Sequence, residues 1–186
     1  MPISVASPTK TPGLAAAIRE LIRVTLAGEG RVPGTIDVRL TGDAELRALN
    51  RQWRGIDRAT DVLSFAYDDR ARRVSGDLVI SLDRMRAQAR RYRVTAGREL
   101  ARLIVHGALH LAGHDHHRAG ERRIMRGRER AALREGRGAI GRLESVSISE
   151  TRAGSRETTR SRRRRAAGAS RASSRPSARG PRARRG

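Results

Sequence analysis

Apolar residues recur every three or four positions in five stretches of the chain, which is the spacing of one buried face of a helix. In 35–40 they instead alternate with polar residues, as in a strand with one buried face. This mixture of elements is typical of an α+β fold, in which helices cover a small mixed β-sheet. The pattern predicts helices over 14–26, 43–53, 83–92, 97–113 and 118–135, and strands over 35–40, 61–67 and 76–82.

Residue types at the ends of these stretches predict several helix boundaries. Asp83 is expected to cap the helix that follows it, because its carboxylate can accept hydrogen bonds from the first turn. Thr95 or Gly97 is expected to begin the next helix, and Gly113 to end it with a left-handed turn.

Composition divides the chain into three parts. Residues 1–13 are rich in Pro, Ser and Thr and are expected to be loosely ordered. Residues 14–144 carry the apolar pattern and are long enough to bury the core of a single domain. Residues 145–186 contain almost no large apolar residue, so burial cannot offset the entropy of ordering them, and we expect a disordered tail.

The formal net charge of +22 favours polyanionic partners, nucleic acid above all. Residues 1–144 carry 28 basic and 17 acidic residues and 145–186 carry 13 and 2, so each part stands at +11. Every basic residue except Lys10 is arginine. Phosphate recognition uses arginine, but a GC-rich codon bias gives the same excess, and we attribute most of it to that bias.

The chain has no cysteine, which excludes disulfides and cysteine-bound zinc and fits a reducing compartment. No apolar run has the length of a signal peptide or a membrane span. We therefore expect a cytoplasmic protein.

Four of the five histidines lie within 106–116. His106 and His110 are one helical turn apart, so both imidazoles can reach one ion. A left-handed turn at Gly113 would let the chain reverse and bring back His116 as a third ligand. Three protein ligands with an open fourth position describe a catalytic zinc site, and we predict one Zn²⁺ ion, although nickel or copper could occupy the same ligands.

The same histidine spacing occurs in metzincin proteases, whose motif is H-E-x-x-H-x-x-G-x-x-H. Those enzymes carry a glutamate general base where this chain has Gly107. We therefore retain the metal site and reject a peptide-cleaving mechanism that needs that base.

Three ordered motifs resemble the bacterial YbeY family of endoribonucleases. The stretch HGALHLAGHDH at 106–116 resembles the family pattern H-G-x-L-H-L-x-G-(Tyr or His)-D-H. NRQWRGIDRATDVLSF at 50–65 and GDLVIS at 76–81 resemble the same family, so the resemblance extends over about 14–135. It implies an α/β/α layering and a single metallohydrolase-like domain.

The resemblance also implies a function. It indicates a single-strand-specific, metal-dependent endoribonuclease that matures ribosomal RNA, especially the 3′ end of 16S rRNA, and acts in ribosome quality control. The implied partners are single-stranded RNA and the small ribosomal subunit. The tail 145–186 would add RNA contacts by counterion release, unless it is an extension without function.

Arg54 matches the functionally important arginine of the family and is expected to hold the scissile phosphate. Asp115 could orient an imidazole, act as a base or stabilise a turn. Glu99 lies two turns before His106 and is a candidate partner for a ligand, although an exposed helix residue is the stronger interpretation. We assign Thr60, Asp61, Ser64 and Asp77 mainly to the architecture of the cleft, and His114 and His117 to packing or solvent contacts.

Two other functions remain open. The chain could be a ribosome-assembly factor that binds RNA, contains a structural metal and has little nuclease activity. A metallohydrolase acting on small molecules is a third possibility, against which the basic charge argues weakly.

Overall fold

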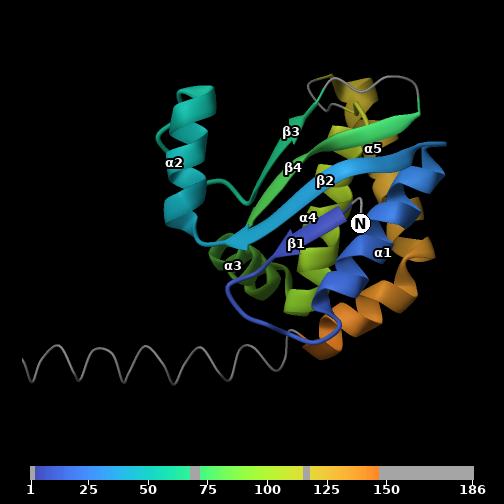
Figure 1. Ribbon diagram of the computed structural model, residues 1–186, viewed down its shortest axis with the longest axis horizontal. Helices are drawn as coiled ribbons and strands as arrows, with labels where there is room; N and C mark the ends of the chain where they lie inside the picture. The colour runs from blue at the N-terminus through green and yellow to red at the C-terminus, as the bar shows by residue number, and fades with distance from the viewer. Residues whose placement is uncertain (1–2, 68–71, 115–117, 147–186) are drawn as a thin grey trace, which may run out of the picture. The chain divides into compact units, whose positions relative to one another are not determined.

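A computed structural model describes residues 3–67, 72–114 and 118–146 of the chain. Four strands and five helices follow one another in this part, and further helical residues extend over 137–146 (Figure 1). Their bounds are β1 Ile3–Ala6, α1 Leu14–Gly28, β2 Val32–Thr41, α2 Asp43–Arg54, β3 Val62–Ala66, β4 Arg73–Ser81, α3 Leu82–Tyr92, α4 Ala96–Leu111 and α5 Ala119–Glu135.

The four strands form one mixed sheet in the order β1-β2-β4-β3. β1 and β4 both run parallel to β2, whereas β3 pairs antiparallel with β4 and forms an edge. Along β2 buried and exposed residues alternate, as predicted from its sequence. Two hollows of the protein surface open beside this edge strand.

Neighbouring residues of a strand point to opposite faces of the sheet, and the two faces are covered differently. Leu78 and Ile80 of β4 belong to the main core with α1 and α4, whereas Val79 packs with Leu63 and Leu46 of α2. In Figure 1 α2 accordingly lies on one side of the sheet, and α1, α4 and α5 lie on the other. The predicted α/β/α layering is confirmed.

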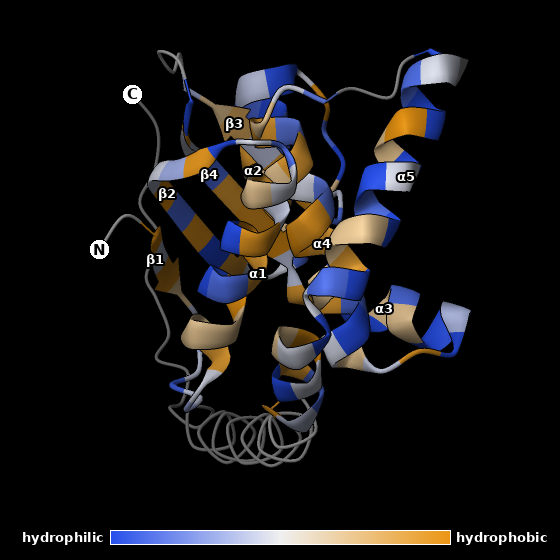
Figure 2. Ribbon diagram, turned by 90° about the vertical axis from the view of Figure 1, so that its right-hand side faces the viewer, coloured by the Kyte–Doolittle hydropathy of each residue, from blue (hydrophilic) through white to orange (hydrophobic). Residues whose placement is uncertain are grey.

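The main core is formed where α4 lies against the sheet. Leu103, Ile104 and Leu109 are fully buried, because they lie on the apolar stripe of a 3.6-residue period. Figure 2 shows hydrophobic residues concentrated in α4 and in the strands beside it. No helix of the described residues is long and apolar enough to cross a bilayer.

Gly107 lets α4 approach the sheet closely. A Cβ atom built on this residue would lie 2.7 Å from Leu78 Cδ2 and 3.4 Å from Val62 Cγ2. A glutamate at this position would have to displace the buried side chain of Leu78 or shift the helix. The residue that excluded a protease mechanism in the sequence therefore has a packing role in the fold.

Two sequence predictions about local structure were wrong. Residues 3–6, within the segment expected to be loosely ordered, form β1 and pair with β2 from Ile36 to Arg39. The cap of α3 is Ser81 and not Asp83, since Ser81 Oγ accepts a hydrogen bond from Arg84 N at 3.1 Å. Most of the predicted tail, from 147 to 186, lies outside the described residues.

Candidate active site

Helix α4 places His106 and His110 side by side. The helix begins after Thr95, whose Oγ1 accepts a hydrogen bond from Arg98 N at 3.1 Å. It ends after Leu111, and Gly113 then adopts the predicted left-handed conformation with φ 94°. The two histidines lie on the half-buried side of the helix, next to the stripe that packs on the sheet.

The geometry of these two histidines fits two ligands of one ion. Their Nε2 atoms are 3.2 Å apart, and the rings are inclined by 79°. Two nitrogens at about 2.0–2.1 Å from a tetrahedral zinc ion would lie about 3.3 Å apart. The predicted third ligand, His116, and its neighbour Asp115 lie outside the described residues. Within 3–67, 72–114 and 118–146, no group of three His, Cys, Asp or Glu residues could hold a metal.

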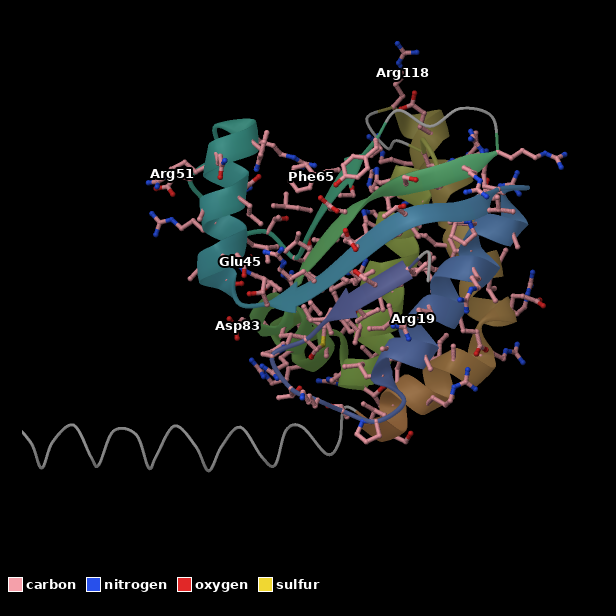
Figure 3. All side chains as sticks on the ribbon, in the orientation of Figure 1. Arg19, Glu45, Arg51, Phe65, Asp83 and Arg118 are labelled. Carbon is pink, nitrogen blue, oxygen red and sulfur yellow. The ribbon has the colours of Figure 1, made fainter. Side chains whose placement is uncertain are left out.

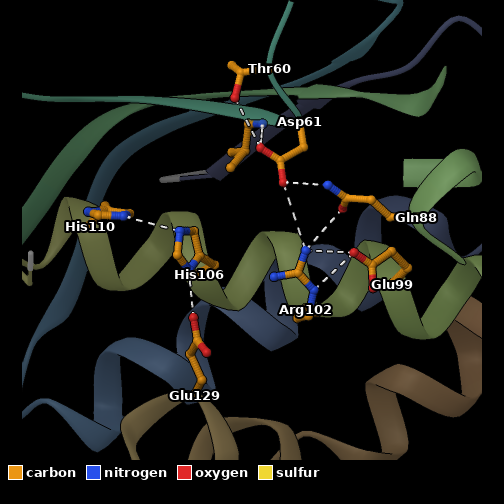
Figure 4. Close-up of polar contacts among 9 residues, drawn as sticks. Thr60, Asp61, Gln88, Glu99, Arg102, His106, His110 and Glu129 are labelled. Atoms are coloured by element: carbon orange, nitrogen blue, oxygen red, sulfur yellow. Dashed lines mark hydrogen bonds and ion pairs between the residues drawn. The ribbon is translucent and has the colours of Figure 1, made fainter. Parts of the chain in front are cut away.

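Glu129 of α5 lies behind His106. Its Oε1 is 2.6 Å from His106 Nδ1, so the carboxylate can accept the Nδ1–H and leave Nε2 facing His110 (Figure 4). Burial alone would raise the pKa of Glu129, but the hydrogen bond from His106 and the nearby positive charges outweigh it and lower that pKa. Sequence analysis missed this residue.

A hollow of about 590 Å³ opens beside the histidines. Arg54 reaches it from the end of α2, which Gly55 stops by adopting a left-handed conformation with φ 70°. The guanidinium of Arg54 makes no ion pair with any described residue, so its charge faces an open space. The hollow is lined by Arg54, Thr60, Asp61, Val62, Ser64, Ala66, His106, His110, Gly113 and His114.

Comparisons with known proteins assign the chain to a family. A family model described as endoribonuclease YbeY matches residues 6–136. The chain belongs to the YbeY family. A relative named endoribonuclease YbeY from Carboxydothermus hydrogenoformans is 44% identical over 117 residues, which are 62% of this chain and 81% of the relative.

Two further comparisons describe the extent of the match. The YbeY of Anaeromyxobacter sp. (strain Fw109-5) is 46% identical over 118 residues, covering 62% of this chain but only 61% of the relative's own length. The solution structure of TM1509 from Thermotoga maritima superposes with a TM-score of 0.50 at 26% identity. It covers 73% of this chain and 92% of that protein, which supports the fold derived above.

His114 occupies the Tyr-or-His position of the YbeY pattern and contacts Glu29, the residue directly after α1. Its Nε2 lies 2.8 Å from Glu29 Oε2, and this carboxylate also lies 3.6 Å from Arg128 Nε. His114 thus links the turn after α4 to the end of α1. This contact agrees with our interpretation of His114 as a packing residue, although its ring also lines the hollow.

Glu99 differs from the interpretation preferred from the sequence, because it is 2% exposed rather than a surface residue. Its Oε1 accepts from Arg102 Nη2 at 2.6 Å, and the same nitrogen donates to Gln88 Oε1 at 3.1 Å (Figure 4). Asp61 Oδ2 lies 3.9 Å from Arg102. None of these contacts reaches a histidine, so Glu99 belongs to a separate ionic cluster.

Asp61 joins that cluster to β3. Its carboxylate accepts hydrogen bonds from Gln88 Nε2 at 2.9 Å, from Val62 N at 3.0 Å and from Thr60 Oγ1 at 3.1 Å. Burial would raise the pKa of Asp61, but these hydrogen bonds outweigh it and lower that pKa. The pattern supports the predicted architectural role of Thr60 and Asp61.

Ser64 and Asp77 lie on different faces of the sheet. Ser64 lines the histidine hollow, whereas Asp77 accepts a hydrogen bond from Tyr67 Oη at 2.7 Å on the α2 side. Phe65, labelled in Figure 3, packs with Leu46 on the α2 side of the sheet, and its ring lies 6.2 Å from that of Trp53. Asp77 therefore does not line the hollow beside the histidines.

Proposed function

We propose that this YbeY family member is a single-strand-specific, metal-dependent endoribonuclease. Its substrate would be ribosomal RNA, with 16S rRNA 3′-end maturation and ribosome quality control as its role. The relatives are named endoribonucleases, and the observation that carries the proposal is the convergence of His106 and His110 beside Arg54. The proposed catalytic domain comprises residues 14–144 together with β1, which pairs with β2, and a role on ribosomal RNA implies a cytoplasmic protein.

His106, His110 and His116 would hold one Zn²⁺. Imidazole nitrogen is a ligand type that zinc prefers, and the distance between the two described Nε2 atoms supports the assignment. When bound, the ion supplies Lewis acidity and lowers the pKa of water toward about 7. Glu129 accepts the Nδ1–H of His106 and so fixes the orientation of that ring.

Arg54 would bind the scissile phosphate. Its exposed guanidinium lines the same hollow as the histidines, and its planar fork suits two phosphate oxygens. There it would stabilise the charge that develops on the phosphate as the bond breaks. We assign to Asp115, which adjoins His116 in sequence, the orientation of that third imidazole.

The test compares His110→Ala with the wild type in nuclease-free, metal-loaded preparations. The variant should cleave no single-stranded RNA while it keeps its fold and its RNA affinity. Arg54→Ala should also lose most cleavage, because the phosphate is no longer held. If the wild type cleaves no RNA but binds immature small subunits, the assembly-factor alternative is correct and the nuclease proposal fails.

A further inference from the structure

A second hollow lies along the first half of α4. Its volume is about 980 Å³, and Asp61 lines both this hollow and the one beside the histidines. Its walls come from α3, α4, α5 and the helical residues 137–146. Five arginines line it, and we call it the arginine groove: Arg98, Arg102, Arg130, Arg134 and Arg137.

Helix geometry aligns this groove with the candidate active site. Arg98, Arg102, His106 and His110 follow one another at intervals of four residues, so they lie on one side of α4. At 1.5 Å per residue, the row spans about 18 Å. A ligand bound at His110 could therefore continue along the helix into the groove without crossing the core.

Arginines outnumber carboxylates in the lining of the groove, where the acidic residues are Asp61, Glu99 and Glu144. Arg102 is engaged by Glu99 and Asp61. Arg98, Arg130, Arg134 and Arg137 are exposed, and none of the four forms an ion pair with a residue in the described ranges. Glu144 also lines the groove, where it accepts a hydrogen bond from Thr95, and its charge offsets one of these four. The remaining excess of positive charge around one hollow favours an anionic ligand.

The groove also offers an aromatic surface. Tyr92 lines it and is 56% exposed, and the guanidinium of Arg91 lies 5.8 Å from the centre of its ring. Exposed aromatic rings beside basic side chains are typical of surfaces that bind single-stranded nucleic acid, because bases stack on the ring. Charge and aromatic surface thus point to the same class of ligand.

The hollow on the other side of β3 is less suited to phosphate. It has a volume of about 560 Å³ and is lined by the carboxylates of Asp37 and Asp77. Its arginine, Arg39, is already paired with Glu45 at 2.7 Å. Repulsion from the two aspartates would oppose a phosphodiester chain there, so the arginine groove is the favoured path from the histidines.

We infer that the arginine groove binds the sugar–phosphate backbone of single-stranded RNA on one side of the scissile phosphate. This inference rests on the proposed function of the histidine site and adds a substrate-binding surface to it. The guanidinium groups of Arg130 and Arg137 contact phosphates, and Tyr92 stacks on a base. The groove sets affinity for RNA longer than the few nucleotides that the histidine hollow holds.

The experiment measures binding of the full-length chain to labelled single-stranded RNA of about 12 nucleotides, with salt varied from about 50 to 200 mM. The double variant Arg130→Ala with Arg137→Ala is compared with a control, Arg23→Ala with Arg73→Ala. The control residues are exposed, form no ion pair in the part of the chain that the structure describes, and line neither hollow. Both doubles remove two positive charges.

The groove variant should bind about tenfold more weakly than the control. Its slope of log affinity against log salt should fall by about 1.4, since each phosphate contact on a single strand contributes about 0.7. The two doubles should bind a trinucleotide alike. The double variant Arg130→Lys with Arg137→Lys should keep most of the wild-type slope, because it keeps the charge.

Equal affinities and slopes for the two doubles would overturn the inference, as would loss of binding to small subunits with unchanged RNA binding. Circular dichroism establishes that each variant is folded. Cleavage by the wild type is measured separately, so the proposed function can fail while the groove still binds RNA. Conversely, a wild type that cleaves RNA while the doubles bind alike refutes only the groove.

Discussion

The two ends of the polar side of α4 carry similar numbers of polar groups but arrange them differently. At the first end, Arg102 and Glu99 bind each other and lie near Asp61 and Gln88 (Figure 4). At the second end, His106 and His110 direct their Nε2 atoms toward one another beside a hollow. At the first end Arg102 and Glu99 are engaged by contacts within the fold, and the exposed Arg98 beside them faces the arginine groove; at the second end both histidines are open to a ligand.

The first end of α4 therefore has mainly a structural role, whereas the histidines at the second end are arranged to bind a ligand. A buried carboxylate such as Glu99 requires a partner, and the arginine supplies it while linking α4 to α3 and β3. Paired imidazole nitrogens backed by Glu129 resemble the arrangement of metal-binding histidines. Four substitutions test whether the two ends have these separate roles.

The largest expected effect is that of His110→Ala on zinc affinity. Loss of one of three ligands should weaken zinc binding by more than about 100-fold, with little change in folding stability. Competition with a chelating dye measures the affinity. His114→Ala is the matched control and should bind zinc like the wild type, because His114 contacts Glu29 instead. Equal losses in both variants would contradict the assignment.

Arg102→Ala should lower the folding stability rather than the zinc affinity. It leaves Glu99, whose side chain is 3% exposed, without its ion-pair partner, and should lower the free energy of unfolding by about 2–3 kcal/mol. Zinc affinity should change little. The control is Arg86→Ala, which removes an exposed pair with Asp83 at the same spacing and should cost less than about 1 kcal/mol in urea unfolding.

Glu129→Ala should weaken zinc binding by about 10–100-fold, since His106 loses the carboxylate that orients its ring. Glu129→Gln keeps one acceptor oxygen and should lose less. Glu135→Ala, an exposed residue of the same helix, serves as the control. Zinc affinity equal to that of the control would show that Glu129 does not act on the metal site.

The smallest expected effect is that of Asp61→Asn on the folding stability and on its dependence on pH. The folded-state pKa of Asp61 lies below its unfolded value, so its charged form stabilises the fold above the unfolded pKa. At pH 7 Asp61→Asn should cost about 1 kcal/mol. The difference between wild type and variant should shrink as pH falls below about 4 and vanish below the folded-state pKa. A difference independent of pH would refute this cause.

The fold could be predicted from the sequence wherever its signal is local. The 3.6-residue period of α4 and the alternation of β2 both describe one face of a single element, and both were predicted correctly. β1 was missed because four residues become a strand only by pairing with β2, from which they are separated by α1. The cap of α3 was misassigned because Ser81 and Asp83 are both suitable residues.

The part of the candidate site that lies on a single helix could likewise be predicted from the sequence. The spacing of His106 and His110 places them on adjacent turns of any helix, so their proximity follows from the sequence. Glu129 was missed because its contact with His106 depends on how α5 packs on α4. Its position in a row with buried Met125 and Ala132 was the available signal, because a carboxylate there needs a partner. Glu99 was predicted to be exposed because its burial also depends on how other elements pack against α4.

The most direct test of the account is X-ray absorption at the zinc edge of the full-length chain loaded with one equivalent of Zn²⁺. Three imidazole nitrogens at about 2.0–2.1 Å and one oxygen ligand are predicted for the wild type, with one imidazole fewer in His110→Ala. A zinc environment without imidazole, or an identical spectrum for the variant, would contradict the proposal that these histidines hold the ion.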